Sequence, residues 1–328
     1  MKHFSLGIDI GGSKINFLIF NFLNRKILFK KRIDIRPKIK KQALLDLVKK
    51  EANEIIEKIG RKNILGIGLG VPGSLNIKKG SILKTPNIPS LAGLPIQKIF
   101  SDYFKIPVKI ENDARAFVLA EYLYGAGQGA CSIIGVTLGA GVGGGIMIDG
   151  KLWLGEAGSA GEVGHMTINR ERRTERQKLL SFEDLVSRKG YLRFSKEKPE
   201  ILQKRAEAGD KKSIEIFEKI GKDLGIGLAN LVNILNPEKI IIGGRLIKAG
   251  DLLLRPAKKQ MRRLFFSPLA KKTLILRTKL GEDAGAIGAA NLFFRVGAGQ
   301  FLTESSCGAV RWQKSVLPNS SKFSRFKK

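Results

Sequence analysis

Acidic side chains are scarce in this chain. The 328 residues include 29 aspartates and glutamates against 59 lysines and arginines, a formal net charge of +30. Such a surface attracts polyanions such as nucleic acid, polyphosphate or anionic lipid, and it speeds the encounter with an anionic substrate. The basic residues are nevertheless spread along the chain among acidic ones, as in residues 41–59. This distribution favours a generally lysine-rich composition and argues against nucleic acid as a partner.

Two stretches depart from this mixing. Residues 253–280 and the tail after Glu304 carry lysine and arginine with no acid at all. A basic patch near the C-terminus therefore stays open as an alternative.

Cysteine is also rare. Cys131 and Cys307 lie far apart and match no metal or disulfide spacing. Their spacing excludes a disulfide framework and favours a reducing compartment. The first ten residues, MKHFSLGIDI, have only a short apolar stretch and lack the small-residue cleavage pattern of a secretory signal. We therefore expect a cytoplasmic protein.

Charge is missing altogether from residues 122–148, a length that could span a bilayer. The dense glycines of this segment favour a different structure, with a helix end, a buried strand, a tight loop and a second strand. We expect no association with a membrane.

The remaining sequence alternates strand and helix patterns, which predicts an α/β fold. With 43% hydrophobic residues the chain can bury a full core, and its length suggests two domains. The predicted strands cover residues 4–10, 14–22, 63–70, 106–112 and 238–244, and the predicted helices cover 41–59, 211–236 and 282–294, with a further helix from about Asp113. Residues 71–76 and 84–95 are expected to be turn-rich loops, and the pattern dissolves after about Arg295.

Part of this plan occurs twice. Residues 132–154 form a strand, a glycine loop and a second strand, as do the residues that surround DIGGSK near the N-terminus. Two such halves facing each other would form a cleft.

The glycine loops are candidates for binding phosphate. DIGGSK, Asp9 to Lys14, places an acid at a strand end before two glycines, a hydroxyl and a lysine, and TLGAGVGGG offers a second loop at 137–145. Backbone amides exposed by glycine bind anions, and the acid can orient hydrated magnesium. For one loop alone a plain hairpin turn is the better interpretation. Neither loop has P-loop or dinucleotide-binding spacing, but two matched loops favour a phosphate donor held between two domains.

Asn112 and Asp113 precede the apolar spacing of a helix in the segment KIENDARAFVLAE. Helix capping accounts for both residues, because their side chains accept hydrogen bonds from the unpaired amides of a first turn. On this segment alone, capping is the favoured interpretation.

Taken together, the motifs resemble the ROK family of sugar kinases, within the actin-like ATPase superfamily. The resemblance runs from about residue 5 to about residue 294 and rests on DIGGSK, GLGVPGSLN, TPNIP, ENDARAFVLAE, TLGAGVGGGIMIDGKL, AGEVGH and NPEKIIIGG, in that order. It implies a two-lobed actin-like ATPase (ribonuclease H-like) fold with a duplicated strand-loop-strand core and an interdomain cleft. The implied small lobe is 1–112 plus 281–295, the large lobe is 113–280, and 296–328 is a basic, disordered tail.

The resemblance also assigns a role to each matching residue. Asp113 is implied to be the general base that takes the proton from the attacking sugar hydroxyl. The residues implied to contact ATP and its phosphates are Asp9, Gly11, Gly12, Ser13, Lys14, Gly139, Gly141, Gly143, Gly243 and Gly244, with Asp9 also serving Mg²⁺. The residues implied to bind the sugar are Gly73, Asn87, Asn112, Asp113, Glu162, His165 and Glu183. For His165 a purely structural histidine is the alternative.

Two departures from the family pattern matter. Ala140 stands where the family usually has a threonine, which removes a hydroxyl that could touch phosphate. Most relatives also follow the glycine-histidine pair with a cysteine-rich run that binds structural zinc, whereas here Thr174, Arg176 and Ser181 occupy the cysteine positions. Without thiolates the site lacks its main ligands, so we predict no zinc.

The zinc-free loop needs another anchor. Leu179, Leu180 and Phe182 are expected to supply it by burial, each contributing about 1.5–3 kcal/mol.

The sequence leaves three functions open. The first is an ATP-dependent hexose kinase that phosphorylates glucose, and the second is a polyphosphate-dependent gluco- or mannokinase, which the basic charge would suit. The third is a sugar-sensing transcription regulator without activity; such regulators carry an N-terminal DNA-binding domain, whereas the phosphate motif here begins at Asp9. The resemblance to the ROK family also implies a homodimer.

Overall fold

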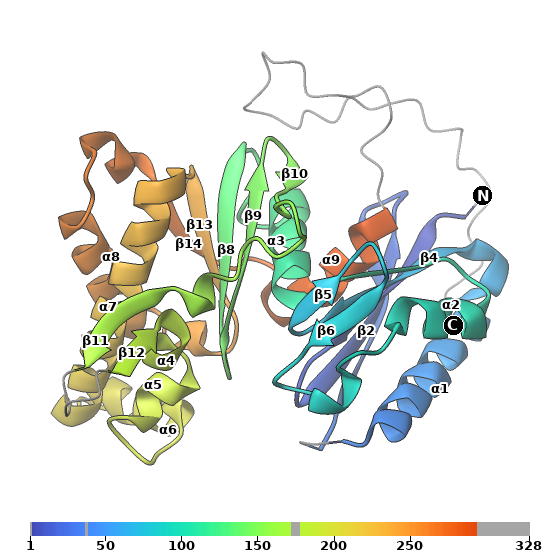
Figure 1. The fold of residues 1–328 in the computed structure, drawn as a ribbon, viewed down its shortest axis with the longest axis horizontal. Helices are drawn as coiled ribbons and strands as arrows, with labels where there is room; N and C mark the ends of the chain where they lie inside the picture. The colour runs from blue at the N-terminus through green and yellow to red at the C-terminus, as the bar shows by residue number, and fades with distance from the viewer. Residues whose placement is uncertain (1, 37–38, 172–177, 294–328) are drawn as a thin grey trace.

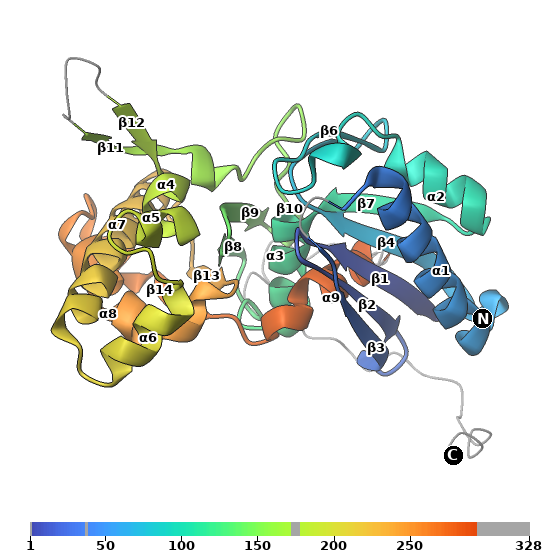
Figure 2. The same cartoon turned by 90° about the horizontal axis from the view of Figure 1, so that it is seen from below.

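The computed structural model describes residues 2–36, 39–171 and 178–293. They form two α/β lobes, each built on a five-stranded sheet, and two helices, α3 and α9, lie between the sheets in both views (Figures 1 and 2). The tail expected at 296–328 lies outside the described residues.

The first sheet has the strand order β3-β2-β1-β4-β7. Its strands are β1 (Phe4–Ile10), β2 (Lys14–Asn21), β3 (Lys26–Asp34), β4 (Ile64–Val71) and β7 (Val108–Asn112). β1 pairs antiparallel with β2 and parallel with β4, and β4 pairs parallel with β7. Helices α1 (Lys41–Ile59) and α2 (Ile96–Phe104) cover its outer face, because their apolar sides share one buried core with β1, β4 and β7.

The second sheet repeats this arrangement with the order β10-β9-β8-β13-β14. Its strands are β8 (Ser132–Leu138), β9 (Val142–Ile148), β10 (Lys151–Leu152), β13 (Lys239–Gly243) and β14 (Leu274–Arg277). β8 pairs antiparallel with β9 and parallel with β13, as β1 does with β2 and β4. The predicted duplication of strand, glycine loop and strand is therefore present.

Helices and a small hairpin complete the second lobe. They are β11 (Thr167–Glu171), β12 (Lys178–Ser181), α4 (Phe182–Val186), α5 (Arg188–Leu192), α6 (Pro199–Glu207), α7 (Lys211–Leu235) and α8 (Asp251–Arg263). α7 ends as predicted just before Pro237, with Asn236 in the left-handed conformation. Its apolar face shares a core with β8, β13 and α8.

A third core joins the lobes. It contains residues of β2, β8, β9 and β13 around the helices α3 (Asp113–Tyr124) and α9 (Ala284–Ala290). Glycine is required where α9 meets its neighbours, because a Cβ at Gly7 would overlap the backbone of Ala286, and one at Gly288 would overlap that of Ala116. The lobe boundaries expected at 112/113 and 280/281 stay a prediction.

Three predictions of local structure need correction. The segments 71–76 and 84–95 are not loops throughout, since β5 (Ser74–Asn76) and β6 (Ser81–Lys84) form a hairpin and Pro89–Leu91 is a 3-10 turn. The helix expected over 282–294 is shorter, because 3-10 turns at Gly281–Asp283 and Asn291–Phe293 flank α9. Short 3-10 turns also occur at Arg61–Asn63, Val163–His165, Leu246–Ala249 and Pro268–Lys272.

The cysteine expectation also needs correction. Cys131 is disulfide-bonded, which contradicts the expectation that the cysteines match no disulfide.

The uncharged segment 122–148 has the predicted structure, because it holds the end of α3, β8, a glycine loop and β9. Within the described ranges no helix is both long and apolar enough to cross a bilayer.

Candidate active site

The first glycine loop is the turn between β1 and β2. Its geometry is fixed by the Gly11 amide, which donates to the carbonyl of Lys14 over 2.9 Å. Gly12 lies against Asn87, since a Cβ on Gly12 would come within 3.3 Å of the Asn87 Cβ. The structure therefore brings the predicted phosphate loop against a predicted sugar-binding residue.

Asp9, at the end of β1, faces Asn16 across the β1–β2 pair. The Asn16 amide donates to the Asp9 carboxylate over 3.3 Å. Burial, followed by the nearby negative charge of Asp113, raises the pKa of Asp9 to about 7. Gly70 separates the two acids, because a Cβ there would lie 3.5 Å from Asp9 Oδ1 and 3.8 Å from the Asp113 Cα.

Asn112 and Asp113 stand where β7 passes directly into α3. The Asn112 Oδ1 accepts from the amides of Ala114 and Arg115 over 3.0 and 3.1 Å, and the Asp113 Oδ1 accepts from the Ala114 amide over 2.9 Å. Both side chains therefore accept hydrogen bonds from the first turn, as the capping interpretation predicts. The Asn112 Nδ2 donates to the carbonyl of Gly73 over 3.1 Å, which ties two predicted sugar residues together. Burial raises the pKa of Asp113, and the charge of Glu162 adds to this effect.

A buried ion pair supports this junction. Arg115 Nε donates to Glu111 Oε1 over 2.7 Å, with only 3% and 6% of the two side chains exposed. Arg115 also donates through Nη1 to the carbonyl of Gly158 over 2.7 Å, and Glu111 accepts from the Asn112 amide over 2.8 Å. The pair therefore links the end of β7 to the loop that precedes Glu162.

The second glycine loop connects β8 and β9. The Gly139 amide donates to the carbonyl of Gly141 over 2.9 Å, so a backbone hydrogen bond closes this loop too, over two residues where the first loop spans three. Glu183, predicted to bind sugar, accepts from the Val142 amide over 3.1 Å and pairs with Lys189 over 2.7 Å. The Glu183 carboxylate thus lies against this loop, and its role toward sugar stays a prediction.

Further predicted residues lie at the edges of these loops. Gly243 is the last residue of β13 and Gly244 follows it; a Cβ on Gly244 would meet the backbone of Leu138, just before the second glycine loop. Glu162 and His165 are exposed; Glu162 precedes the 3-10 turn Val163–His165, and His165 is its last residue. Gly143 packs against Ala114, one residue after the predicted base.

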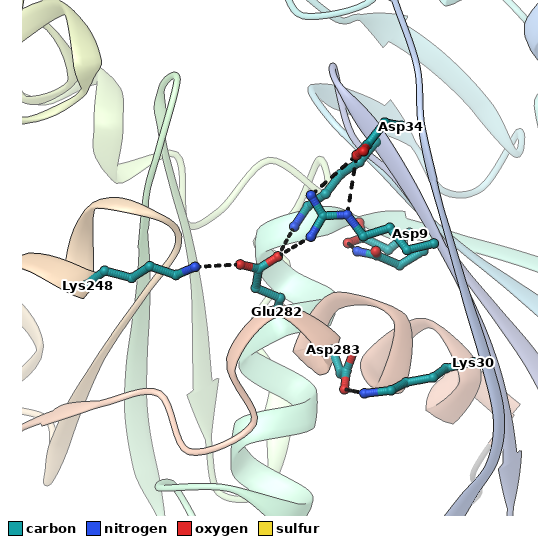
Figure 3. A network of polar contacts seen from close by, with 9 residues as sticks. Asp9, Lys30, Asp34, Lys248, Glu282 and Asp283 are labelled. Carbon is teal, nitrogen blue, oxygen red and sulfur yellow. Dashed lines mark hydrogen bonds and ion pairs between the residues drawn. The ribbon is translucent and has the colours of Figure 1, made fainter. Parts of the chain in front are cut away.

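Lys14 and Ser13 complete the first loop. Ser13 is exposed, whereas Lys14 pairs with Glu282 over 2.5 Å, a partner that the sequence did not suggest. Figure 3 shows Glu282 between Lys248 on one side and the β1–β2 region with Asp9 on the other.

The predicted zinc-free loop is described only in part, because Thr174 and Arg176 lie outside the described residues. Leu180 and Phe182 are buried as predicted, but Leu179 is 57% exposed, so its predicted anchoring role is wrong. The β11–β12 pairing explains this, because Leu179 and Leu180 are adjacent in a strand and point to opposite faces. Within the described residues no group of three or more His, Cys, Asp or Glu could hold a metal ion; the absence of zinc stays a prediction.

Comparison with known proteins identifies the family. The model of the ROK family matches residues 5–296. The chain belongs to the ROK family. A glucokinase of Halalkalibacterium halodurans is 35% identical over 250 residues, 70% of this chain and 76% of that protein. A xylose repressor of Caldicellulosiruptor bescii is 31% identical over 305 residues, 86% of this chain and 76% of that protein.

Solved structures agree with this assignment. A ROK family glucokinase from Streptomyces griseus, solved with glucose and AMPPNP, superposes with a TM-score of 0.75 at 27% identity over 88% of this chain and 98% of that one. The expected two-lobed actin-like ATPase fold is therefore confirmed for this member of the ROK family.

Proposed function

We propose that this ROK protein is a hexose kinase that transfers the γ-phosphoryl group of ATP to glucose and forms glucose 6-phosphate. The observation that carries the proposal is the position of Asp113. Asp113 is the first residue of α3 and lies near Asp9, at the end of the strand that leads into the first glycine loop. On the other side, the Asn112 side chain donates a hydrogen bond to the carbonyl of Gly73. A sugar hydroxyl held by Asn112 and Gly73 would thus lie between a base and a phosphate-binding loop.

In the proposed reaction the hydroxyl oxygen attacks the γ-phosphorus, the bond to the β–γ bridging oxygen breaks, and ADP leaves. The hydroxyl proton passes to the Asp113 carboxylate and then to solvent. Burial raises the pKa of Asp113 and thereby makes it a stronger base than an exposed aspartate. The remaining task of the protein is alignment and charge stabilisation, which the Gly12 amide and the Lys14 ammonium of the first glycine loop suit.

The donor set fits Mg²⁺ as well as ATP. Asp9 has a pKa raised to about 7 by burial and by Asp113, so a divalent cation beside it would offset the repulsion of the two carboxylates. Asp9 would hold the hydrated ion, which when bound would neutralise phosphate charge.

The test is a coupled kinase assay against a panel of sugars, with ATP and with polyphosphate as donors, for the wild type and Asp113→Asn. We expect turnover of glucose with ATP and a decrease in kcat of about 10²–10⁴-fold in the variant, because the proton acceptor is lost. Glucose binding measured by calorimetry should change little. Asp102→Asn on the exposed face of α2 serves as the control. Normal turnover in Asp113→Asn would disprove the assignment of the base.

The similarity to a xylose repressor supports one competing function, a sugar-responsive regulator. A DNA mobility-shift assay with and without residues 296–328 separates it from the kinase, since a kinase has no need of sequence-specific DNA binding. Preference for polyphosphate over ATP in the donor comparison would favour the second kinase type instead.

We further propose that the kinase is a cytoplasmic homodimer. ATP as the substrate supports the location, and sedimentation velocity tests the dimer.

A further inference from the structure

One carboxylate, Glu282, gathers three cations from both lobes. It contacts Lys14 of β2 over 2.5 Å, Arg32 of β3 over 2.8 Å and Lys248, which follows β13, over 2.9 Å. Figure 3 shows Lys248 reaching Glu282 from the side opposite to the first sheet. Glu282 itself lies in the 3-10 turn that precedes α9.

This cluster contributes little to holding the fold together. The Glu282 side chain is 41% exposed, and those of Arg32 and Lys248 are 48% and 62% exposed. Ion pairs as exposed as those of Arg32 and Lys248 contribute little to stability, since water screens them and ordering long side chains costs entropy; Lys14 is less exposed, at 20%. The convergence of three cations on one acid therefore needs another explanation than stability.

The position of the cluster supplies that explanation. Three residues after Glu282, Gly285 packs against Asp9, and a Cβ there would lie 2.7 Å from Asp9 Oδ2. Lys14 belongs to the first glycine loop, and its charge lowers the pKa of Asp9 against the larger effects of burial and Asp113. The cations thus stand beside the acid and the loop that the proposed function assigns to the phosphates.

We propose that Lys14, Arg32 and Lys248 are the cations that receive the phosphate tail of the donor, and that Glu282 holds them together until phosphate displaces it. The inference rests on the proposed function and adds Arg32 and Lys248 to the donor site. A triphosphate carries more negative charge than one carboxylate and offers several acceptor oxygens, so it competes effectively for the same donors. Glu282 accordingly lowers the apparent affinity for the donor.

The competition does not depend on pH near neutrality. Hydrogen bonds from Lys14 and then Lys248 lower the pKa of Glu282 to about 2, so the carboxylate stays ionised. Asp34 also contacts Arg32, over 3.3 Å, and keeps that guanidinium beside the cluster when Glu282 moves away.

The neighbouring residue provides a matched control. Asp283 pairs with Lys30 of β3 over 3.0 Å, an ion pair of the same type that includes none of the three cations. Figure 3 shows this pair next to the Glu282 cluster. Asp283→Asn therefore removes one exposed ion pair and one negative charge at nearly the same place.

The experiment measures binding of AMPPNP and of inorganic tripolyphosphate by calorimetry to the full chain, so it does not depend on turnover. We expect Glu282→Gln to bind both probes about 3- to 10-fold more tightly, because the substitution removes all three ion pairs with which Glu282 competes for these cations. Asp283→Asn should stay within about twofold of the wild type. Lys248→Met should bind both probes more weakly, and glucose affinity should not change in any variant.

Each outcome decides the matter. Unchanged or weaker binding in Glu282→Gln, or equal tightening in Asp283→Asn, would overturn the inference, as would unchanged binding in Lys248→Met. If the wild type phosphorylates glucose but Glu282→Gln behaves like Asp283→Asn, only the inference fails. If the wild type binds neither probe and transfers no phosphate, the proposed function fails together with it.

Discussion

Asp9 lies near the end of β1, and Asp113 directly follows β7. The structure places the two acids on either side of Gly70. The pKa of Asp9 reaches about 7 as a result of burial and of the negative charge of Asp113. Two adjacent carboxylates are an unfavourable arrangement in the absence of a cation. The fold therefore keeps a destabilising pair of carboxylates at the site where we propose that phosphoryl transfer takes place.

The pH dependence of stability tests this arrangement. Because the pKa of Asp9 is raised from 3.8 to about 7 in the folded state, its protonated form stabilises the fold at low pH, and this contribution is lost as pH rises toward 7. We expect Asp9→Asn to leave the melting temperature nearly unchanged at pH 4. At pH 8 the variant should melt at a higher temperature, because the raised pKa of Asp9 costs the folded state on the order of 4 kcal/mol of unfolding free energy there. Thermal denaturation without nucleotide or magnesium measures the difference.

The outcome that contradicts this prediction is the same change in melting temperature at both pH values. Asp102→Asn is the control, because its pKa is lowered by Lys98 and it should not stabilise the protein at pH 8.

At the residue scale the sequence predicted the charged positions but not their partners. Asp9, Lys14 and Asp113 were identified from short motifs, and the structure brings Asp9 and Asp113 together. Asn16 could have been found from the alternation of β2, since it faces Asp9 across a tight hairpin. Glu282 and Lys248 lie far from Lys14 in sequence, and no local pattern signals a contact of that range.

At the scale of elements, one buried ion pair joins three segments. Arg115 of α3 contacts Glu111 of β7 and the carbonyl of Gly158, so the base-bearing helix and the loop before Glu162 share one side chain. Lys98 and Asp102 of α2 have the same i,i+4 spacing but are 73% and 59% exposed. The two pairs therefore differ chiefly in burial.

This contrast gives a second stability prediction. Arg115→Met should destabilise the protein by about 3–5 kcal/mol, because it leaves the Glu111 carboxylate buried without its cation. Lys98→Met should change stability by less than about 1 kcal/mol, since water screens that pair. Denaturant unfolding measures both values, and equal effects would show that burial does not set the strength of the Arg115 pair.

Strands and helices with strong periodicity were predictable, and the exceptions have physical reasons. β3 escaped prediction because the strand KILFKKRID lies at the sheet edge, where it is largely exposed and carries charge. The β5–β6 hairpin was not predicted, because its short strands lie among turn-forming residues that indicate a loop. The glycines and alanines of α9 allow close packing, which its composition suggests. Where the helix ends depends on its contacts with neighbours such as α3, which the sequence does not show.

At the scale of the whole molecule, charge is the most unusual property. A net charge of +30 concentrates anions near the surface and would raise the rate at which the proposed donor, ATP, meets its site. A neutral sugar gains nothing from this field. The proposed kinase should therefore respond unequally to salt for its two substrates.

We expect kcat/KM for ATP to fall severalfold as NaCl rises from about 50 to about 500 mM, because the Debye length shrinks to a few ångströms. The value for glucose, measured at saturating ATP, should change far less. Initial-rate kinetics at constant free Mg²⁺ provides the comparison. Parallel changes for both substrates would indicate a general effect of salt on the enzyme and not steering of the donor.

The central position of α9 bears on how the protein is made. Ser5 at the start of the chain donates to the carbonyl of Ala290 over 2.5 Å, and α9 covers β1 where Gly7 leaves room for it. A ribosome synthesises that covering helix only after the strands β8, β9, β13 and β14 of the second sheet. Until then one apolar side of the first sheet is uncovered, and this interval is when a chaperone would have most to protect.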